Sequence, residues 1–155
     1  MRNIGLVALF IGVLGVSACS DQGKQFAATT DRIAGYIGTG LVVVDQLSTA
    51  EQISPETATA IVTVLRQVNT INGQVIVEAK KYVKPDGTLA LTGDGQQKIL
   101  TLVSSANGLV TNLLNDSRVI NLPEAQRKQI NAFSINLKQT LIALDQLIKT
   151  IKLVR

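Results

Sequence analysis

The stretch EAQRKQINAFSINLKQTLIALDQLIKTI, residues 124–151, decides the fold because its apolar side chains recur at spacings of three and four. That spacing is the period of an α-helix with one apolar face. The residues of this face are Ile130, Phe133, Leu137, Leu141, Leu144, Ile148 and Ile151. At ~1.5 Å per residue a helix of about 30 residues spans roughly 45 Å, so the sequence predicts an elongated body.

Three more segments have the same period, at about residues 24–47, 54–82 and 96–115. Together the four segments predict an all-α fold, an up-down-up-down four-helix bundle packed through Leu, Ile, Val and Ala.

The expected helix starts have recognisable capping residues. Ser54 followed by Pro55 is a strong helix start, since serine caps well and proline suits the first helical position. Asp94 is the predicted cap of the third helix. Asn121 and Glu124 have the spacing of a capping box and predict the start of the fourth helix.

A β-rich alternative arises because Asn72-Gly73 and Asn107-Gly108 are strong hairpin signals in a chain rich in Val, Ile and Thr. The apolar period continues through Asn72-Gly73 without a change, whereas a hairpin demands strict alternation on both sides, so helix is favoured. A glycine inside a helix costs about 1 kcal/mol relative to alanine, which suggests a close helix contact or a kink at Gly73 and Gly108. In residues 88–92 the large apolar side chains occupy every second position, which predicts a short extended segment between two turns.

Gly35, Gly38 and Gly40 lie in the order G-x-x-G-x-G within the first predicted helix. Glycine-rich turns can bind phosphate through backbone N–H groups, but here no strand precedes the glycines and no lysine follows them. The favoured interpretation is a seam of small residues against which a neighbouring helix packs closely.

Several classes of chemistry lack their residues in this chain. The sequence has no histidine, the commonest general base and zinc ligand, and Cys19 is its single cysteine. Asp86 and Asp94 lack the dense spacing of a calcium loop and are interpreted as turn and cap residues. The other acids, Glu78 among them, are expected to be isolated and solvated. We therefore expect no enzyme, no cofactor and no metal site. Chemistry by a convergent pair of buried carboxylates is the alternative.

The first eighteen residues have the features of a secretory signal peptide. Arg2 is the positive start, residues 4–16 form an apolar run, and the small residues Ser17 and Ala18 follow it. An apolar run of 13 residues is too short to span a bilayer, which needs roughly 20 helical residues. An ordinary signal peptide or an uncleaved anchor, with an incidental Cys19, is the alternative.

Val16-Ser17-Ala18-Cys19 resembles the lipobox of bacterial lipoprotein signal peptides. The resemblance covers residues 1–19 and implies cleavage before Cys19, with acylation of its sulfur and its new amino group. Acyl chains would then hold the protein in the membrane of a bacterial cell envelope. Ser20, and not an aspartate, follows the cysteine. In a host with two membranes the resemblance then implies sorting to the periplasmic face of the outer membrane.

The expected organisation is a signal peptide at 1–18, a lipidated cysteine and tether at 19–23, and one helical domain at 24–155. Without the signal peptide the chain has 14 basic and 11 acidic residues, because only Arg2 is lost with it. Lys80, Lys81 and Lys84 form its one basic cluster. The cluster is interpreted as a solvated helix end, with contact to anionic head groups or lipopolysaccharide phosphates as the alternative. Nucleic acid is not an expected partner.

A second apolar row beside the main stripe of residues 124–151 is the candidate interaction surface: Ile135, Ile142, Leu147 and Leu153. It favours a lipid-anchored, non-enzymatic protein that binds, scaffolds or inhibits an envelope protein or a second copy of itself. The alternative is a carrier or sensor of an apolar small molecule or lipid held between the helices.

Overall fold

The computed structural model describes residues 21–154. The predicted signal peptide, the lipobox and Cys19 lie outside the described residues. Within them the chain is all-α, as predicted, with five helices: α1 Asp21–Thr49, α2 Pro55–Lys80, α3 Gly93–Leu114, α4 Ser117–Ile120 and α5 Glu124–Thr150. The described part contains no strand, and its β structure is limited to one isolated bridge between Val83 and Leu89.

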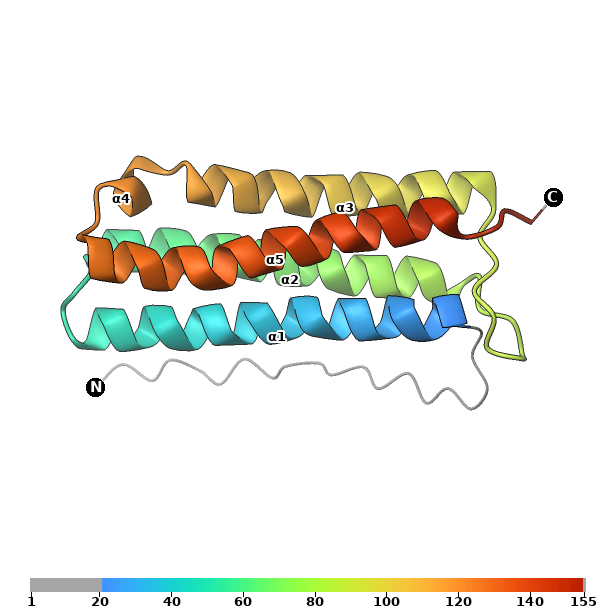
Figure 1. Cartoon of the computed structure of the whole chain (residues 1–155), viewed down its shortest axis with the longest axis horizontal. Helices are drawn as coiled ribbons and strands as arrows, with labels where there is room; N and C mark the ends of the chain where they lie inside the picture. The colour runs from blue at the N-terminus through green and yellow to red at the C-terminus, as the bar shows by residue number, and fades with distance from the viewer. Residues whose placement is uncertain (1–20, 155) are drawn as a thin grey trace.

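The long helices lie side by side in an elongated bundle (Figure 1). α1 packs against α2 and α5, and α3 packs against the same two helices. In Figure 1 each long helix runs in the direction opposite to the one before it, and the short α4 lies in the connection between α3 and α5. Each long helix therefore has two covered flanks and one outer face.

The apolar periodicity identifies the core correctly. All seven predicted inward positions of the 124–151 segment are buried, and Ile33, Leu65, Ile99 and Leu137 lie among the completely enclosed side chains. The four long helices contribute to one continuous hydrophobic core. Each contributes one stripe because only one side of its 3.6-residue period faces its neighbours.

The predicted helix starts are confirmed in one case and wrong in two. The Ser54 hydroxyl accepts a hydrogen bond from Thr57 N–H at 3.1 Å, and Pro55 is the first residue of α2. At α3 the cap is Thr92, whose hydroxyl accepts from Gly95 N–H at 3.1 Å, while Asp94 lies inside the first turn. At α5 Pro123 occupies the cap position without a side-chain hydrogen bond, so the expected capping box does not form.

Two boundaries also differ from the prediction. α1 begins at Asp21, so residues 21–23 of the predicted tether belong to its first turn. The four-residue α4 was not predicted, because a helix of this length is too short to show an apolar period. It is organised locally by Asp116, whose carboxylate accepts from Arg118 N–H at 2.9 Å.

The segment between α2 and α3 has the predicted extended character, but only the first of its two predicted turns forms, because residues 93–95 are the start of α3. Its turn is closed by Gly87 N–H donating to the Lys84 carbonyl at 2.8 Å, and Gly87 has a φ of 78°, which suits glycine. Leu89 and Leu91 are both buried, so the alternation places them on one side. Val154 N–H donates to the Leu91 carbonyl at 2.9 Å, which holds the C-terminal tail against this segment.

The mid-helix glycines occur in α-helix, as predicted, but without the close contacts that we expected. A Cβ added at Gly73 or Gly108 would have no neighbour within 4 Å. Gly35 and Gly38 of the predicted seam are equally open. Only Gly40 lies against another helix, so the seam within this chain is reduced to one residue.

Among residues 21–154 the structure contains no helix that is both long enough and apolar enough to cross a membrane.

Candidate functional site

The outer face of α5 carries two of the four residues of the predicted apolar row. Ile135 is 44% exposed and Ile142 is 43% exposed, although the large apolar side chains of the main stripe are buried. The two isoleucines are seven residues apart in the chain. Seven residues are about two helical turns, so both side chains lie on the same side of α5. We call this pair the α5 outer pair.

Leu147 and Leu153 do not belong to this surface, so the predicted row is wrong as a single unit. Leu147 follows Ile142 by five residues, which rotates it by about 140° around the helix axis. It is partly buried and packs against the core. Leu153 is 50% exposed but lies beyond the end of α5, in the C-terminal tail.

The neighbouring part of α1 has an outer face of small side chains. Gly35, Gly38 and Val42 follow one another at helical spacing, and Val42 is 56% exposed. The contact between Gly40 and Phe133 places this part of α1 at the height of the α5 outer pair. Close approach of a further helix is therefore unobstructed by side chains at both glycines.

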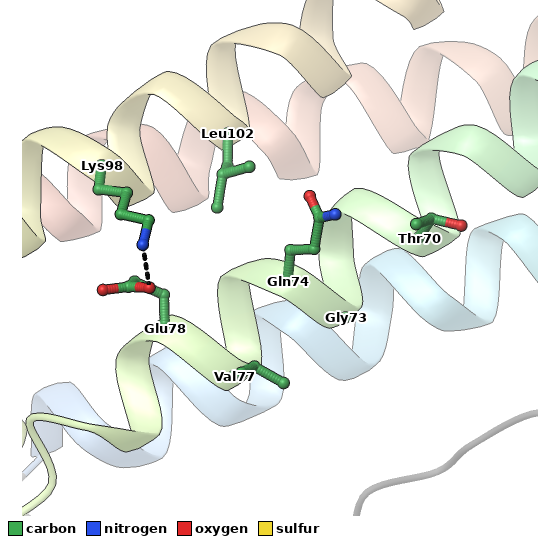
Figure 2. Close-up of a pocket in the computed structure, with 7 residues that line it drawn as sticks. All are labelled: Thr70, Gly73, Gln74, Val77, Glu78, Lys98 and Leu102. Atoms are coloured by element: carbon green, nitrogen blue, oxygen red, sulfur yellow. Dashed lines mark ion pairs between the residues drawn. The ribbon is translucent and has the colours of Figure 1, made fainter.

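A groove runs along the surface between α2 and α3, with a volume of about 540 Å³ (Figure 2). Its lining residues come from both helices: Thr70, Gly73, Gln74, Val77, Glu78, Lys98 and Leu102. Hydroxyl, amide, carboxylate and ammonium groups border it together with apolar groups. Most of its lining surface is nevertheless apolar. It is an open groove at the surface, and not the void lined by Ala, Gly and Val between the helices that would support a carrier of apolar ligands.

The buried carboxylate of Glu78 closes one end of the groove. Its Oε2 lies 2.8 Å from Lys81 Nζ. It also lies 2.8 Å from Lys98 Nζ, and this pair joins α2 to the start of α3 (Figure 2). The Tyr82 hydroxyl donates to Glu78 Oε1 at 3.4 Å. Glu78 was expected to be isolated and solvated, and that expectation is wrong. Lys81 three residues later was a visible local signal, but the sequence could not place Lys98 nearby.

This ion-pair cluster sets the protonation of Glu78. Hydrogen bonds from Lys81 and then Lys98 outweigh the opposing effect of burial and lower the pKa of Glu78 from 4.5 to about 2. The same carboxylate raises the pKa of Lys98. Glu78 is therefore ionised at neutral pH and acts as a fixed charge that connects two helices.

Replacing Glu78 with glutamine should lower stability at neutral pH, because it leaves two lysines without their shared anion. A folded-state pKa below the unfolded value stabilises the protein above pH 4.5, and this contribution is lost as the pH falls toward about 2. The difference in free energy of unfolding between wild type and Glu78→Gln should thus be constant above about pH 5 and vanish near pH 2. Urea unfolding monitored by circular dichroism across this range measures it.

Glu124→Gln is the matched control, because Glu124 forms an ion pair with Lys128 in which both side chains are largely exposed. Exposed pairs of this type contribute little, so this variant should remain close to wild type at every pH. A Glu78→Gln effect that is as small, or that does not change with pH, would contradict a structural role for the cluster.

The remaining acids do not assemble into a site. Asp86 has the predicted turn role, since its carboxylate accepts from Thr88 N–H at 2.9 Å, while Asp94 lies in the first turn of α3. Residues 21–154 contain no group of three or more Cys, Asp or Glu side chains arranged to hold a metal ion.

These features define an all-α protein of the helical-bundle class, with an apolar pair on the outer face of α5 and a surface groove between α2 and α3. Comparison of the chain with protein-family models, with curated proteins and with solved structures found no match.

Proposed function

We propose that this chain is a lipid-anchored, non-enzymatic protein of the bacterial cell envelope that acts by binding another protein. Its four long helices form an up-down-up-down bundle in which α4 is part of a connection. Acyl chains on Cys19 would hold it in the membrane, at the periplasmic face of the outer membrane in a host with two membranes.

The observation that carries this proposal is the exposure of Ile135 and Ile142 on one side of α5. Fully burying an isoleucine side chain contributes about 1.5–3 kcal/mol, and both residues still have nearly half of their surface to bury. Two apolar anchors separated by two helical turns suit a partner that also presents an apolar helix.

The neighbouring face of α1 supports the same type of partner. Gly35 and Gly38 add no side-chain bulk, and the nearest space beyond each is empty. A partner helix can therefore approach the backbone of α1 closely at this height of the bundle, as helices do at small-residue contacts. We propose that the partner is an envelope protein that contributes one helix to this surface.

Crosslinking in intact cells tests this function. A photoreactive amino acid at Gln139, which is exposed and lies between Ile135 and Ile142 in α5, should yield one dominant crosslinked protein, identified by mass spectrometry. Ile135→Asp together with Ile142→Asp should reduce the crosslink about tenfold or more, because two charges would be desolvated at the contact. Circular dichroism of the variant should stay helical, since both positions are at the surface.

Val77→Asp is the matched control, because Val77 is 61% exposed but lies on α2 beside the groove. It should leave the crosslink unchanged. If instead Val77→Asp removes the crosslink and the double variant on α5 does not, the binding surface is the groove. A crosslink only to a second copy of this chain would make the partner the protein itself.

A further inference from the structure

One end of the bundle gathers four segments that are distant in sequence. Gln22 Nε2 donates to the Thr150 carbonyl at 3.2 Å, which places the start of α1 beside the end of α5. Gln96 Nε2 donates to the Ile148 carbonyl at 2.9 Å and adds the start of α3. The segment between α2 and α3 and the C-terminal tail lie at the same end (Figure 1). We call residues 21–24, 78–98 and 145–154 the anchor end.

The anchor end is basic, whereas the opposite end is acidic. It contains seven lysines and five acids: Lys24, Lys80, Lys81, Lys84, Lys98, Lys149 and Lys152 against Asp21, Glu78, Asp86, Asp94 and Asp145. Residues 45–56 and 116–128 at the opposite end contain five acids and three basic residues. The bundle is therefore polarised along its long axis, with the positive end where α1 begins.

At the anchor end the lysines lie outermost, with the paired acid beneath them. Glu78 is buried beneath Lys81 and Lys98, whose side chains are 54% and 60% exposed, so the solvent meets the two ammonium groups rather than the carboxylate. Lys24, Lys80, Lys84 and Lys152 are also exposed, and none of them forms an ion pair within the described residues.

Exposed apolar side chains accompany these lysines. Val83, Leu153 and Val154 are all exposed at the anchor end. Val83 forms a bridge with Leu89, and Val154 N–H donates to the Leu91 carbonyl. The segment between α2 and α3 therefore holds these exposed side chains at the same end of the bundle. Lysines beside small apolar groups are typical of protein surfaces that lie in the head-group region of a membrane.

The chain also brings this end to the membrane. Cys19 precedes the first residue of α1 by two positions, and two extended residues span only about 7 Å. We propose that the anchor end docks directly on the surface of an anionic phospholipid bilayer, with the bundle axis directed away from it. This inference rests on the proposed acylation of Cys19.

Docking in this orientation sets the height of the proposed protein contact. Ile142 and Ile135 precede the end of α5 by eight and fifteen residues. At ~1.5 Å per residue they lie about 12 and 22 Å from that end, beyond the head groups and accessible to a partner anchored in the same membrane.

Depth measurement on the acylated full-length chain tests the orientation. Single cysteines at Val83 and, at the opposite end, Ile120 receive the same fluorophore, and acylation leaves no free thiol at Cys19. The chain is reconstituted in vesicles of phosphatidylcholine and phosphatidylglycerol that contain a lipid with a nitroxide on its head group. Quenching at position 83 should exceed quenching at position 120 several-fold, and added salt should reduce the difference.

Replacing Lys80, Lys84 and Lys152 with glutamine should reduce quenching at position 83. The control replaces Arg66, Lys128 and Lys138 with glutamine, which removes the same positive charge outside the anchor end. It should leave quenching at position 83 unchanged. Equal quenching at positions 83 and 120 would overturn the proposal. So would quenching at position 83 that is as strong in vesicles of phosphatidylcholine alone as in vesicles that also contain phosphatidylglycerol. The intact mass of the chain shows separately whether Cys19 is acylated, so failure of the anchor is distinguished from failure of docking.

Discussion

Replacing Cys19 with alanine should convert an acylated protein that lacks residues 1–18 into an unacylated precursor that retains them. Each methylene buried in the bilayer contributes about 0.8 kcal/mol, so losing several acyl chains is the largest change expected for any single substitution in this chain. The mass of the intact protein measures processing and acylation together. Partition between detergent and aqueous phases measures anchoring.

Ser20→Ala is the control for this experiment, since it changes the next residue without removing the thiol. It should be processed and acylated like the wild type. Lipidation would be refuted if wild type and Cys19→Ala differed equally in mass from the full unmodified chain and partitioned equally. That outcome would favour an ordinary signal peptide or an uncleaved anchor. The helical domain would remain as described, but the membrane tether of the proposed function would be lost.

The largest effect on stability should come from Gly40→Leu. A Cβ at Gly40 would lie 2.8 Å from two ring carbons of Phe133 and 2.9 Å from Leu65 Cδ1, all within the buried core. A leucine adds three further carbons in this region, so we expect a loss of about 3 kcal/mol in the free energy of unfolding. Urea or thermal unfolding followed by circular dichroism measures it.

Gly38→Leu is the matched control, with the same substitution two residues earlier in the same helix. No atom lies within 4 Å of a Cβ at Gly38, so leucine meets open space and gains helix propensity. It should stabilise the chain by about 0.5–1 kcal/mol. Equal effects of the two substitutions would show that α1 does not pack on α5 through Gly40. Gly38→Leu should also weaken the proposed partner contact, because it fills the open face of α1.

Much of the fold was predictable because its signals are local. The stripe from Ile130 to Ile151 identified the buried face of α5, and Ser54 with Pro55 identified the start of α2. The candidate site was predictable only in part. Ile135 and Ile142 are exposed as expected, but Leu147 is not, because a spacing of five residues turns it toward the core.

The groove between α2 and α3 was not predictable, because its residues belong to helices that the sequence does not orient relative to one another. Glu78 and Lys98 are separated by the whole segment between these helices, and their ion pair forms only when α3 packs beside α2. The cap of α3 is Thr92, and not the predicted Asp94, for a related reason. The preceding segment is held by Leu89 and Leu91 in the core, which brings the helix start to Gly93.

By itself, the sequence determined the four long helices, the stripe that each one buries, and the turn chemistry between them, since a 3.6-residue period and a capping residue act over a few neighbouring positions. Only the tertiary structure decided which glycine of α1 meets another helix, which acid is buried beneath two lysines, and which apolar side chains remain uncovered. These properties depend on which helices become neighbours and how each is rotated about its axis. Contacts between residues far apart in the chain set both.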